Sequence, residues 1–297
     1  MLRHGLSSPV KPARVVVMGA HGFVGNAIAG LLEQASVPVL RLTRKDIDLL
    51  APGAAENLAA RFQPGDSFVA VSALAPCRDA RMLRDNMTMA LAMIEATTKA
   101  QLSYIVNISS DAVYADGPLP LTEASPTAPE SLHGVMHLAR ELMFKATVKA
   151  PLAILRPSLL YGAGDPHNGY GPNRFRRLAA KGEPIALFGE GEERRDHVLI
   201  DDVAEIAARV LYRRSTGILN VATGTVASFR EIAETVVRLS GKPVVIKGTP
   251  RSGPIPHNGY RPFDIAACHA AFPDFAYVPL ASGLAKAWRD ESIRGVP

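Results

Sequence analysis

The sequence of 297 residues predicts an α/β fold, a doubly wound parallel sheet with a smaller C-terminal lobe. Three observations predict it. Short apolar, β-branched runs alternate with longer helical patterns, a glycine-rich loop follows the first run, and the composition changes after Pro157. Because strands that alternate with helices of this length form βαβ units, we expect parallel strands joined by right-handed crossovers.

The elements follow in order from the N-terminal end. Residues 14–18 form a short β-branched run that ends at a glycine, as in a buried parallel strand. A helix is expected next, because Val24, Ile28 and Leu32 recur at helical spacing. Further strands are predicted at residues 37–42, 67–72, 104–109 and 152–156, and further helices at residues 81–100 and 133–149.

The composition indicates an ordinary globular protein, since 47% of the residues are apolar and 21% are charged. The 33 basic and 28 acidic residues give a net charge of +5. The basic residues are scattered rather than gathered into a stripe, so we expect no nucleic-acid partner. This charge fits a phosphorylated small molecule and a plain solvated surface equally well. No stretch approaches the ~20 apolar residues of a membrane span, so no membrane insertion is expected.

The N-terminal segment and the cysteines predict a cytoplasmic location. Residues 1–14 are polar and include Pro9 and Pro12, without the apolar run that a signal peptide needs. Cys77 and Cys268 show no CxxC spacing and no partner cluster. Reduced thiols are therefore favoured over a disulfide framework or a zinc site.

The loop at residues 19–25 follows the first strand and opens the predicted helix. Gly19, Gly22 and Gly25 suit a tight turn, a close approach of the backbone to a pyrophosphate and close packing of helix against strand. The start of the helix then offers unpaired N–H groups and the positive end of its dipole to phosphates. A mere turn is the alternative, but the position between strand and helix favours a Rossmann-type dinucleotide site.

The end of the second predicted strand bears on the choice between NAD and NADP. An NAD site is expected to carry an acidic residue there for the ribose hydroxyls. This strand instead runs into Thr43, Arg44 and Lys45, and the first carboxylate is Asp46. Two cations suit a 2′-phosphate, which favours NADP over NAD, while solvated loop charges are the alternative.

The chain divides functionally near Pro157. Residues 162–172 are rich in Gly, Pro and Asn, which is typical of a long irregular segment that carries function. We predict a dinucleotide-binding Rossmann domain over residues 1–157. Residues 158–297 are predicted to form mainly a substrate-binding lobe, with segments that return to the first domain.

Several further motifs stand in a fixed order along the chain. They are Ser-Ser-Asp-Ala-Val-Tyr at residues 109–114, Leu-Arg-Pro at 155–157, Tyr-Gly at 161–162, Phe-Gly-Glu-Gly at 188–191 and Arg-Asp-His-Val-Leu-Ile-Asp-Asp-Val at 195–203. Together with the glycine loop they resemble the motifs of the extended short-chain dehydrogenases/reductases over nearly the whole chain. That family includes nucleotide-sugar epimerases, dehydratases and 4-ketoreductases.

The resemblance implies residues for the cofactor and for catalysis. Ser110, four residues before Tyr114, matches the family's hydroxyl that holds the substrate oxygen. A strand-end hydroxyl that satisfies the backbone is the alternative. The cofactor-binding residues implied are Gly19, Gly22, Phe23, Val24, Gly25, Arg44, Asp48, Leu49, His137 and Pro157.

The sequence departs from the family at the proton-handling Tyr and Lys. The family's Tyr-Gly-x-Ser-Lys-Leu-x-x-Glu segment appears here as residues 133–141, with His133 and His137 at the Tyr and Lys positions. The two histidines are four residues apart and therefore share one face of a helix. An imidazole titrates near pH 6.5, so His133 can serve as the general acid/base, and His137 can donate to the cofactor ribose.

Two other interpretations accompany this pair. Histidines four residues apart can bind zinc, but no third ligand accompanies them, so no metal is expected. Alternatively, two substitutions at the centre of the site are typical of a catalytically weakened or inactive relative, a cofactor-binding regulatory or scaffold protein.

On the substrate side, the resemblance places Asn173 and Arg195 at a nucleotide diphosphate and Arg261 at a second phosphate or ribose contact. A guanidinium fork suits bidentate phosphate binding. Asp201 and Asp202 are expected to open a helix and cap its N–H groups. The resemblance thus implies an NAD(P)-dependent epimerase or 4-ketoreductase of a nucleotide-linked sugar, paired as a homodimer.

Overall fold

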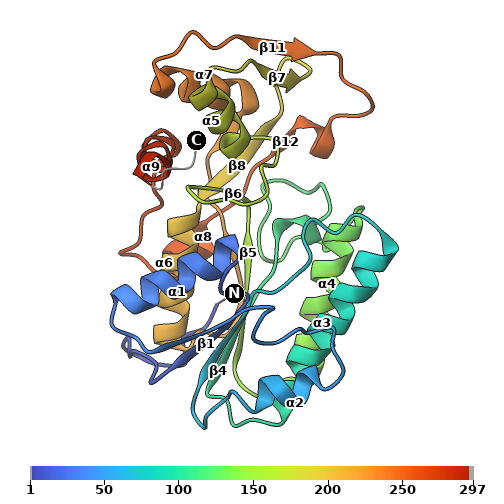
Figure 1. Cartoon of the computed structure of the whole chain (residues 1–297), viewed down its shortest axis with the longest axis vertical. Coiled ribbons are helices and arrows are strands. Elements are labelled where there is room, and N and C mark those ends of the chain that lie inside the picture. Colours follow the sequence, from blue (N-terminus) through green and yellow to red (C-terminus); the bar gives the residue numbers. More distant parts are fainter. Residues whose placement is uncertain (1, 294–297) are drawn as a thin grey trace.

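A parallel sheet forms the lower part of the molecule in Figure 1, which shows the computed structural model; residues 2–293 are described. Within these residues the sheet has six strands in the order β2-β1-β3-β4-β5-β9, and every neighbouring pair is parallel. The strands are β1 (Val15–Met18), β2 (Val39–Leu42), β3 (Ser67–Ala70), β4 (Tyr104–Ile108), β5 (Leu152–Pro157) and β9 (Gly217–Val221). The predicted α/β fold with a doubly wound parallel sheet is therefore confirmed.

The strand order also locates a crevice. Strands β2 and β3 lie on opposite sides of β1, so the chain changes direction across the sheet at β1. In open α/β sheets, ligands bind outside the carboxyl ends of the strands at such a switch point. The sheet thus directs a ligand to the loops that follow β1 and β3.

Two predicted strands are two residues longer than the structure has them. The strand predicted at 67–72 ends at Ala70, because the N–H groups of Val71 and Ser72 both donate to Met18 O and the chain turns there. The strand predicted at 37–42 begins only at Val39, because Val37 N–H is bound by Leu32 O at the end of the preceding helix.

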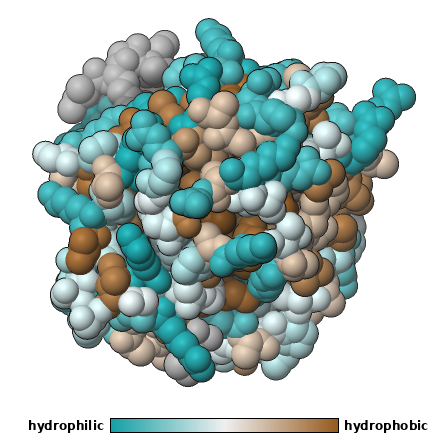
Figure 2. All heavy atoms as spheres, turned by 90° about the horizontal axis from the view of Figure 1, so that it is seen from below, coloured by the Kyte–Doolittle hydropathy of each residue, from teal (hydrophilic) through white to brown (hydrophobic). Residues whose placement is uncertain are grey.

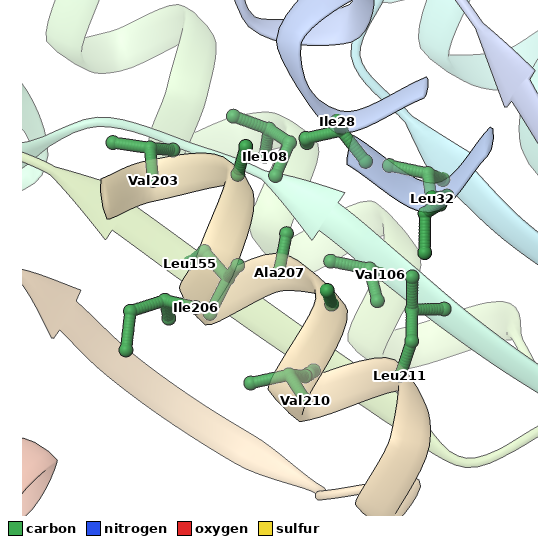
Figure 3. Packing of buried hydrophobic residues seen from close by; sticks show 14 of the residues in the cluster. Ile28, Leu32, Val106, Ile108, Leu155, Val203, Ile206, Ala207, Val210 and Leu211 are labelled. Atoms are coloured by element: carbon green, nitrogen blue, oxygen red, sulfur yellow. The ribbon is translucent and has the colours of Figure 1, made fainter. Parts of the chain in front are cut away.

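Helices cover both faces of the sheet. Helices α1 (Phe23–Gln34) and α6 (Ile200–Arg213) lie on one face, and α2 (Ala54–Ala59), α3 (Ala80–Thr98) and α4 (Leu132–Thr147) on the other. Figure 3 shows Ile28 of α1 and Ile206 of α6 with Val106 of β4 in one fully buried cluster. Each such side chain contributes about 1.5–3 kcal/mol when removed from water.

The lobe stands above the carboxyl edge of the sheet (Figure 1). Its strands are β6 (Leu159–Tyr161), β7 (Ile185–Phe188), β8 (Arg194–Leu199), β10 (Val226–Ser228), β11 (Ile246–Thr249) and β12 (Tyr260–Arg261). The remaining helices of the described chain are α5 (Pro172–Lys181), α7 (Phe229–Ser240), α8 (Ala266–Ala271), α9 (Leu280–Ile293) and the single turns η1 (Asp111–Val113) and η2 (Pro256–Gly259). The lobe has its own apolar cluster, which includes Tyr161, Phe175 and Phe229.

Three segments after residue 157 belong to the first core. Strand β9 pairs with β5, helix α6 packs on the sheet, and Cys268 of α8 is buried in the same cluster. Asp201 and Asp202 stand in the first turn of α6 as expected, but their carboxylates do not cap it. Asp202 accepts from Val278 N–H at 3.0 Å and Asp201 pairs with Lys286 at 2.9 Å, so the acidic pair ties α6 to the C-terminal segment.

The surface is mixed. Seen from below, hydrophilic side chains alternate with small apolar areas over the sheet domain (Figure 2). None of the helices in residues 2–293 is long and apolar enough to cross a membrane. Both Cys77 and Cys268 are buried free thiols.

Candidate active site

A cavity of about 640 Å³ opens at the switch point, along the carboxyl ends of the strands and below the lobe. Most residues that the sequence assigned to a site line it. They are Gly19, Gly22, Phe23, Val24, Arg44, Asp48, Leu49, Ser110, His133, His137, Pro157 and Asn173. Three assigned residues, Gly25, Arg195 and Arg261, are not among its lining residues.

The glycine loop forms one end of the cavity. Gly19 has φ +99°, and a Cβ there would stand 2.8 Å from Ser72 N, so only glycine lets β1 turn beside β3. A Cβ on Gly25 would overlap the carbonyl oxygen of Gly19, so this glycine allows helix and loop to touch. A Cβ on Gly22 would meet only Gly19 O, at 3.3 Å, which leaves the side of Gly22 that faces the cavity open.

The first turn of α1 is free to bind an anion. Its N-cap, Gly22, has no capping side chain, and the turn contains no acidic residue. The N–H groups and positive dipole end of the helix are therefore not neutralised by a carboxylate of their own turn. This loop and helix fit the pyrophosphate of a dinucleotide.

Charged residues after β2 line the neighbouring part of the cavity. The Arg44 guanidinium lies 3.3 Å from Asp48, and their side chains are 75% and 40% exposed. Asp46 turns back and accepts from Thr43 N–H and Thr43 Oγ1, both at 2.8 Å. Asp46 is occupied in this turn, so Asp48 is the carboxylate that faces Arg44, and both Arg44 and Lys45 are exposed to solvent.

Helix α4 carries the two histidines into the middle of the cavity. Ser131 caps the helix by accepting from Gly134 N–H at 3.1 Å. Gly134 then allows close contact with η1, since a Cβ there would overlap Ala112 O. This contact brings the first turn of α4, with His133, beside the end of β4, where Ser110 lies.

The two imidazoles differ in their partners. His133 is half-buried, and its Nδ1 lies 3.4 Å from the backbone nitrogen of Cys77. This long contact does not fix which ring nitrogen carries the proton, so the tautomer with Nε2 free to accept is available. His137 is 7% exposed, and its Nδ1 has no hydrogen-bond partner among the described residues. A buried ring nitrogen without a partner, on a residue that lines a cavity, suits a ligand hydroxyl such as that of a ribose.

Burial makes both histidines neutral at pH 7. It lowers the pKa of His133, against the opposing effect of the Asp111 carboxylate. Burial also lowers the pKa of His137 well below 6.5, and the neighbouring His133 and Arg140 act in the same direction. A neutral His133 can accept a proton, but its remaining N–H is too weak an acid to donate one.

Arg140 is a buried cation that the sequence analysis did not single out. It is 2% exposed and donates to Asn107 Oδ1, Ser72 O and Ala70 O, each at 2.7 Å. Burial lowers its pKa to about 10, so it stays charged at pH 7. Its place three residues after His137, on the same helix face, was the available signal.

A second buried ion pair fixes α4 to the sheet. Glu141 accepts two hydrogen bonds from Arg156, at 2.8 and 2.6 Å, and one from Ser109 Oγ at 2.6 Å. Ser109 precedes Ser110, and Arg156 precedes Pro157, and both of these neighbours line the cavity. The pair therefore holds the ends of β4 and β5 in register with the helix that bears the histidines.

Ser110 has a structural bond as well as a place in the cavity. Its Oγ accepts from Ala112 N–H at 3.1 Å and so caps η1. The backbone role considered for this hydroxyl thus exists alongside its exposure to the cavity. An oxygen that accepts this bond can still donate its own proton to a substrate oxygen.

The substrate-side residues separate into two groups. Asn173 lines the cavity, but its amide is engaged by Gly162 N–H and Asp165, both at 3.0 Å. Arg195 and Arg261 are buried beside η1 and bind carboxylates instead of facing the cavity. Loop residues 165–167, 169 and 170, within the segment that the composition marked as irregular, also line the cavity.

Within residues 2–293, no group of three or more His, Cys, Asp or Glu side chains could hold a metal ion. The glycine cradle and the unpartnered Nδ1 of His137 fit a nicotinamide dinucleotide.

Comparison with known proteins agrees with this arrangement. The NAD dependent epimerase/dehydratase family matches residues 15–222. A dTDP-6-deoxy-L-talose 4-dehydrogenase (NAD(P)(+)) of Kitasatospora kifunensis is 26% identical over 285 residues, 86% of this chain and 88% of that protein. A putative GDP-L-fucose synthase 2 of Oryza sativa subsp. japonica is 27% identical over 253 residues, 76% and 72% of the two chains.

Solved structures share the fold. A UDP-glucose 4-epimerase of Thermus thermophilus, in complex with NAD, superposes with a TM-score of 0.80 at 23% identity, over 95% of this chain and 100% of that one. The family match spans the glycine loop, both histidines and the ends of β4 and β5. The chain therefore belongs to the NAD-dependent epimerase/dehydratase family, a family of nicotinamide-dependent epimerases and oxidoreductases.

Proposed function

We propose that this protein oxidises or reduces a carbinol or keto carbon of a nucleotide-linked sugar, as an epimerase or a 4-ketoreductase, and that His133 handles the proton. The observation that carries the proposal is that Ser110, His133 and His137, whose Nδ1 has no partner among the described residues, line one cavity beside the glycine loop. The names of the two sequence relatives, which act on GDP- and dTDP-linked deoxysugars, support the substrate class.

A nicotinamide cofactor, when bound, would supply the chemistry of hydride transfer. Gly22 and the first turn of α1 would hold its pyrophosphate, and the unpartnered ring nitrogen of His137 would bind its ribose. In the oxidative direction Ser110 donates to the sugar oxygen and orients it. His133, which is neutral at pH 7, takes the hydroxyl proton on Nε2 in its Nδ1–H tautomer as the hydride leaves the carbon.

At neutral pH, His133 is a poorer catalyst of the reductive direction than of the oxidative one. The keto oxygen needs a proton as it becomes a hydroxyl, and the lowered pKa of His133 leaves little imidazolium at pH 7. The same group therefore favours the oxidative half-reaction at neutral pH and the reductive one in mild acid.

We further propose NADP over NAD as the preferred cofactor. Arg44 stands 75% exposed at the edge of the cavity, and Lys45 follows it. A guanidinium in this position suits the 2′-phosphate of NADP, as in related dinucleotide sites. The NAD-bound relative makes NAD the alternative.

A homodimer and a cytoplasmic location also belong to this proposal. The exposed face of α3 and α4 presents large apolar side chains, among them Leu91 at 47% and Leu142 at 56% exposure. Two such helix pairs would bury these side chains in a four-helix interface. Light scattering of the wild type and of Leu142→Glu tests the dimer.

The free, buried thiols of Cys77 and Cys268 support a reducing compartment.

One experiment tests the central proposal. NADH and NADPH are titrated by fluorescence, and a panel of UDP-, GDP- and dTDP-linked sugars is assayed with wild type, His133→Asn and, as matched control, His269→Asn on the exposed side of α8. We expect His133→Asn to bind cofactor normally and to lose about 10²-fold or more in kcat, the usual loss for a general base. Equal rates in all three proteins remove His133 from the mechanism. Tight cofactor binding without turnover across the panel favours a regulatory or scaffold protein.

A further inference from the structure

Asp111 is a buried carboxylate between the lobe and the cavity that the proposed chemistry does not use. It follows Ser110, opens η1 and is 6% exposed. Two lobe arginines converge on its Oδ2: Arg261 Nε at 3.3 Å and Arg195 Nη2 at 3.6 Å. Arg261 also donates to the backbone oxygen of Asp111, at 2.9 Å.

On its other side Asp111 adjoins the proposed catalytic groups. Its Oδ1 lies 3.4 Å from Ser110 Oγ, which also caps the turn that Asp111 opens. The same turn lies directly against the start of α4, because Gly134 leaves no room between Ala112 O and that helix. Any shift of η1 therefore moves Ser110 and presses on the helical turn that carries His133.

The position of η1 depends on cations from the lobe, because its buried carboxylate needs them. A buried carboxylate is strongly destabilised when it loses its cations, and Arg195 and Arg261 supply them here. Arg261 is shared with Asp116, at 2.8 Å, and with His257 Nδ1, at 2.9 Å, while Arg195 is shared with Glu193, at 3.2 Å. The position of the Asp111 carboxylate thus depends on two arginines. The other partners of these arginines lie in the lobe or in the loop after η1.

We propose that Asp111 is a positioning residue that couples Arg195 and Arg261 to Ser110 and His133. Through Asp111, the ion pairs that the two arginines form determine both the position of the Ser110 hydroxyl and how strongly His133 binds a proton. The proposal rests on the proposed function of His133.

The groups around His133 allow a directional test. Asp111 faces it from η1, His137 from α4, and the Cys77 N–H from the loop after β3. Removal of the Asp111 charge should lower the pKa of His133, because that carboxylate is the group that opposes the effect of burial. Removal of Arg195 should raise it, since Asp111 then acts with less of its charge compensated.

The experiment uses the full chain with ¹⁵N-labelled histidine, and His133→Asn identifies the His133 resonances. Asp111→Asn is compared with Asp116→Asn, which also takes a carboxylate from Arg261 but does not adjoin Ser110. We expect Asp111→Asn to lower the pKa of His133 by about half a unit or more and Asp116→Asn to leave it in place. With a turned-over sugar, kcat of Asp111→Asn should fall about tenfold while the cofactor Kd stays within about twofold.

An unchanged His133 titration in Asp111→Asn, or the same shift in both variants, overturns the proposal. If Asp111→Asn does not fold, Arg195→Gln decides: an upward shift supports the coupling and an unshifted titration overturns it. Because the titration needs no substrate, it separates the two proposals. If the protein turns over a sugar but the pKa of His133 does not shift, the proposed function stands and the coupling is wrong. If the pKa shifts but no sugar is turned over, the coupling stands and the proposed function is wrong.

Discussion

The imidazole of His133 meets that of His137 edge to face, with ring centroids 4.7 Å apart and planes at 84°. At this distance a proton on one ring opposes a proton on the other, and burial opposes both. A tyrosine and a lysine in these places would instead form a phenol beside a fixed cation. The pair therefore has a different pH dependence from the Tyr and Lys that the sequence resemblance predicts for these two positions.

The first prediction concerns that pH dependence. Because the pKa of His133 is lowered, the oxidative rate should rise with pH through a value below 6.5 and stay level above it. The reductive rate should fall as pH rises through the same value, since it needs the imidazolium. Steady-state kcat measured from pH 5 to 9 in both directions checks this. A limb above pH 7 that persists in His133→Asn would show that another group controls the rate.

The second prediction compares two glycines of the loop. Gly25→Ala places a methyl group against Gly19 O, in a contact between backbone atoms that cannot relax, so it should destabilise the fold by about 1–3 kcal/mol and abolish cofactor binding. Gly22→Ala meets Gly19 O only at 3.3 Å and should fold nearly normally, but its methyl group should weaken the approach of the pyrophosphate. Thermal unfolding with and without NADPH separates the two effects. Equal melting temperatures for both variants would contradict this account of the loop.

The sequence predicted the fold better than the electrostatics of the site. The glycine loop, Ser110 and the two histidines follow local patterns, so their places at the carboxyl ends of β1, β4 and the start of α4 could be expected. The pairing of Arg195 and Arg261 with Asp111 could not, because these residues are 84 and 150 positions from Asp111 in the chain. Arg140 follows His137 by three residues on one helix face, but its partners could not be predicted: Asn107 and the backbone carbonyls of Ala70 and Ser72 lie 33 to 70 positions away in the chain.

The third prediction tests the cofactor preference. Arg44→Ala should weaken NADPH binding about 10- to 100-fold and leave NADH within about twofold, because a charged hydrogen bond to a phosphate contributes about 1.5–3 kcal/mol. Arg84→Ala is the matched control, since Arg84 is also paired with an aspartate, is 74% exposed and lies outside the cavity lining. Fluorescence titration of both cofactors gives the affinities. An equal loss for NADH and NADPH would exclude a contact with the 2′-phosphate.

The fourth prediction concerns the buried pair of Glu141 and Arg156. Arg156→Met leaves the carboxylate of Glu141 without its main cation in the interior, which should cost about 3–5 kcal/mol of folding free energy. Lys145→Met removes a second, half-exposed cation 3.6 Å from the same carboxylate and should cost at most about 1 kcal/mol. Urea unfolding at pH 7 measures both. Equal losses would mean that the buried pair does not dominate the anchoring of α4.

The last prediction follows from a histidine outside the cavity. His197 is 2% exposed, its Nε2 has no partner among the described residues, and burial lowers its pKa to about 3. Between pH 6.5 and about 3 the unfolded chain binds a proton at this residue that the folded chain does not, so stability falls as the pH falls, by about 1.4 kcal/mol per unit. His133 and His137 act in the same direction because their pKa values are also lowered.

His197→Asn, which keeps an amide donor near Arg195 O, should reduce this slope by about one proton, whereas the exposed control His269→Asn should not. Urea unfolding at half-unit steps from pH 7 to 4 gives the slope, and an unchanged slope in His197→Asn would show that His197 is protonated in the folded protein as readily as in the unfolded chain.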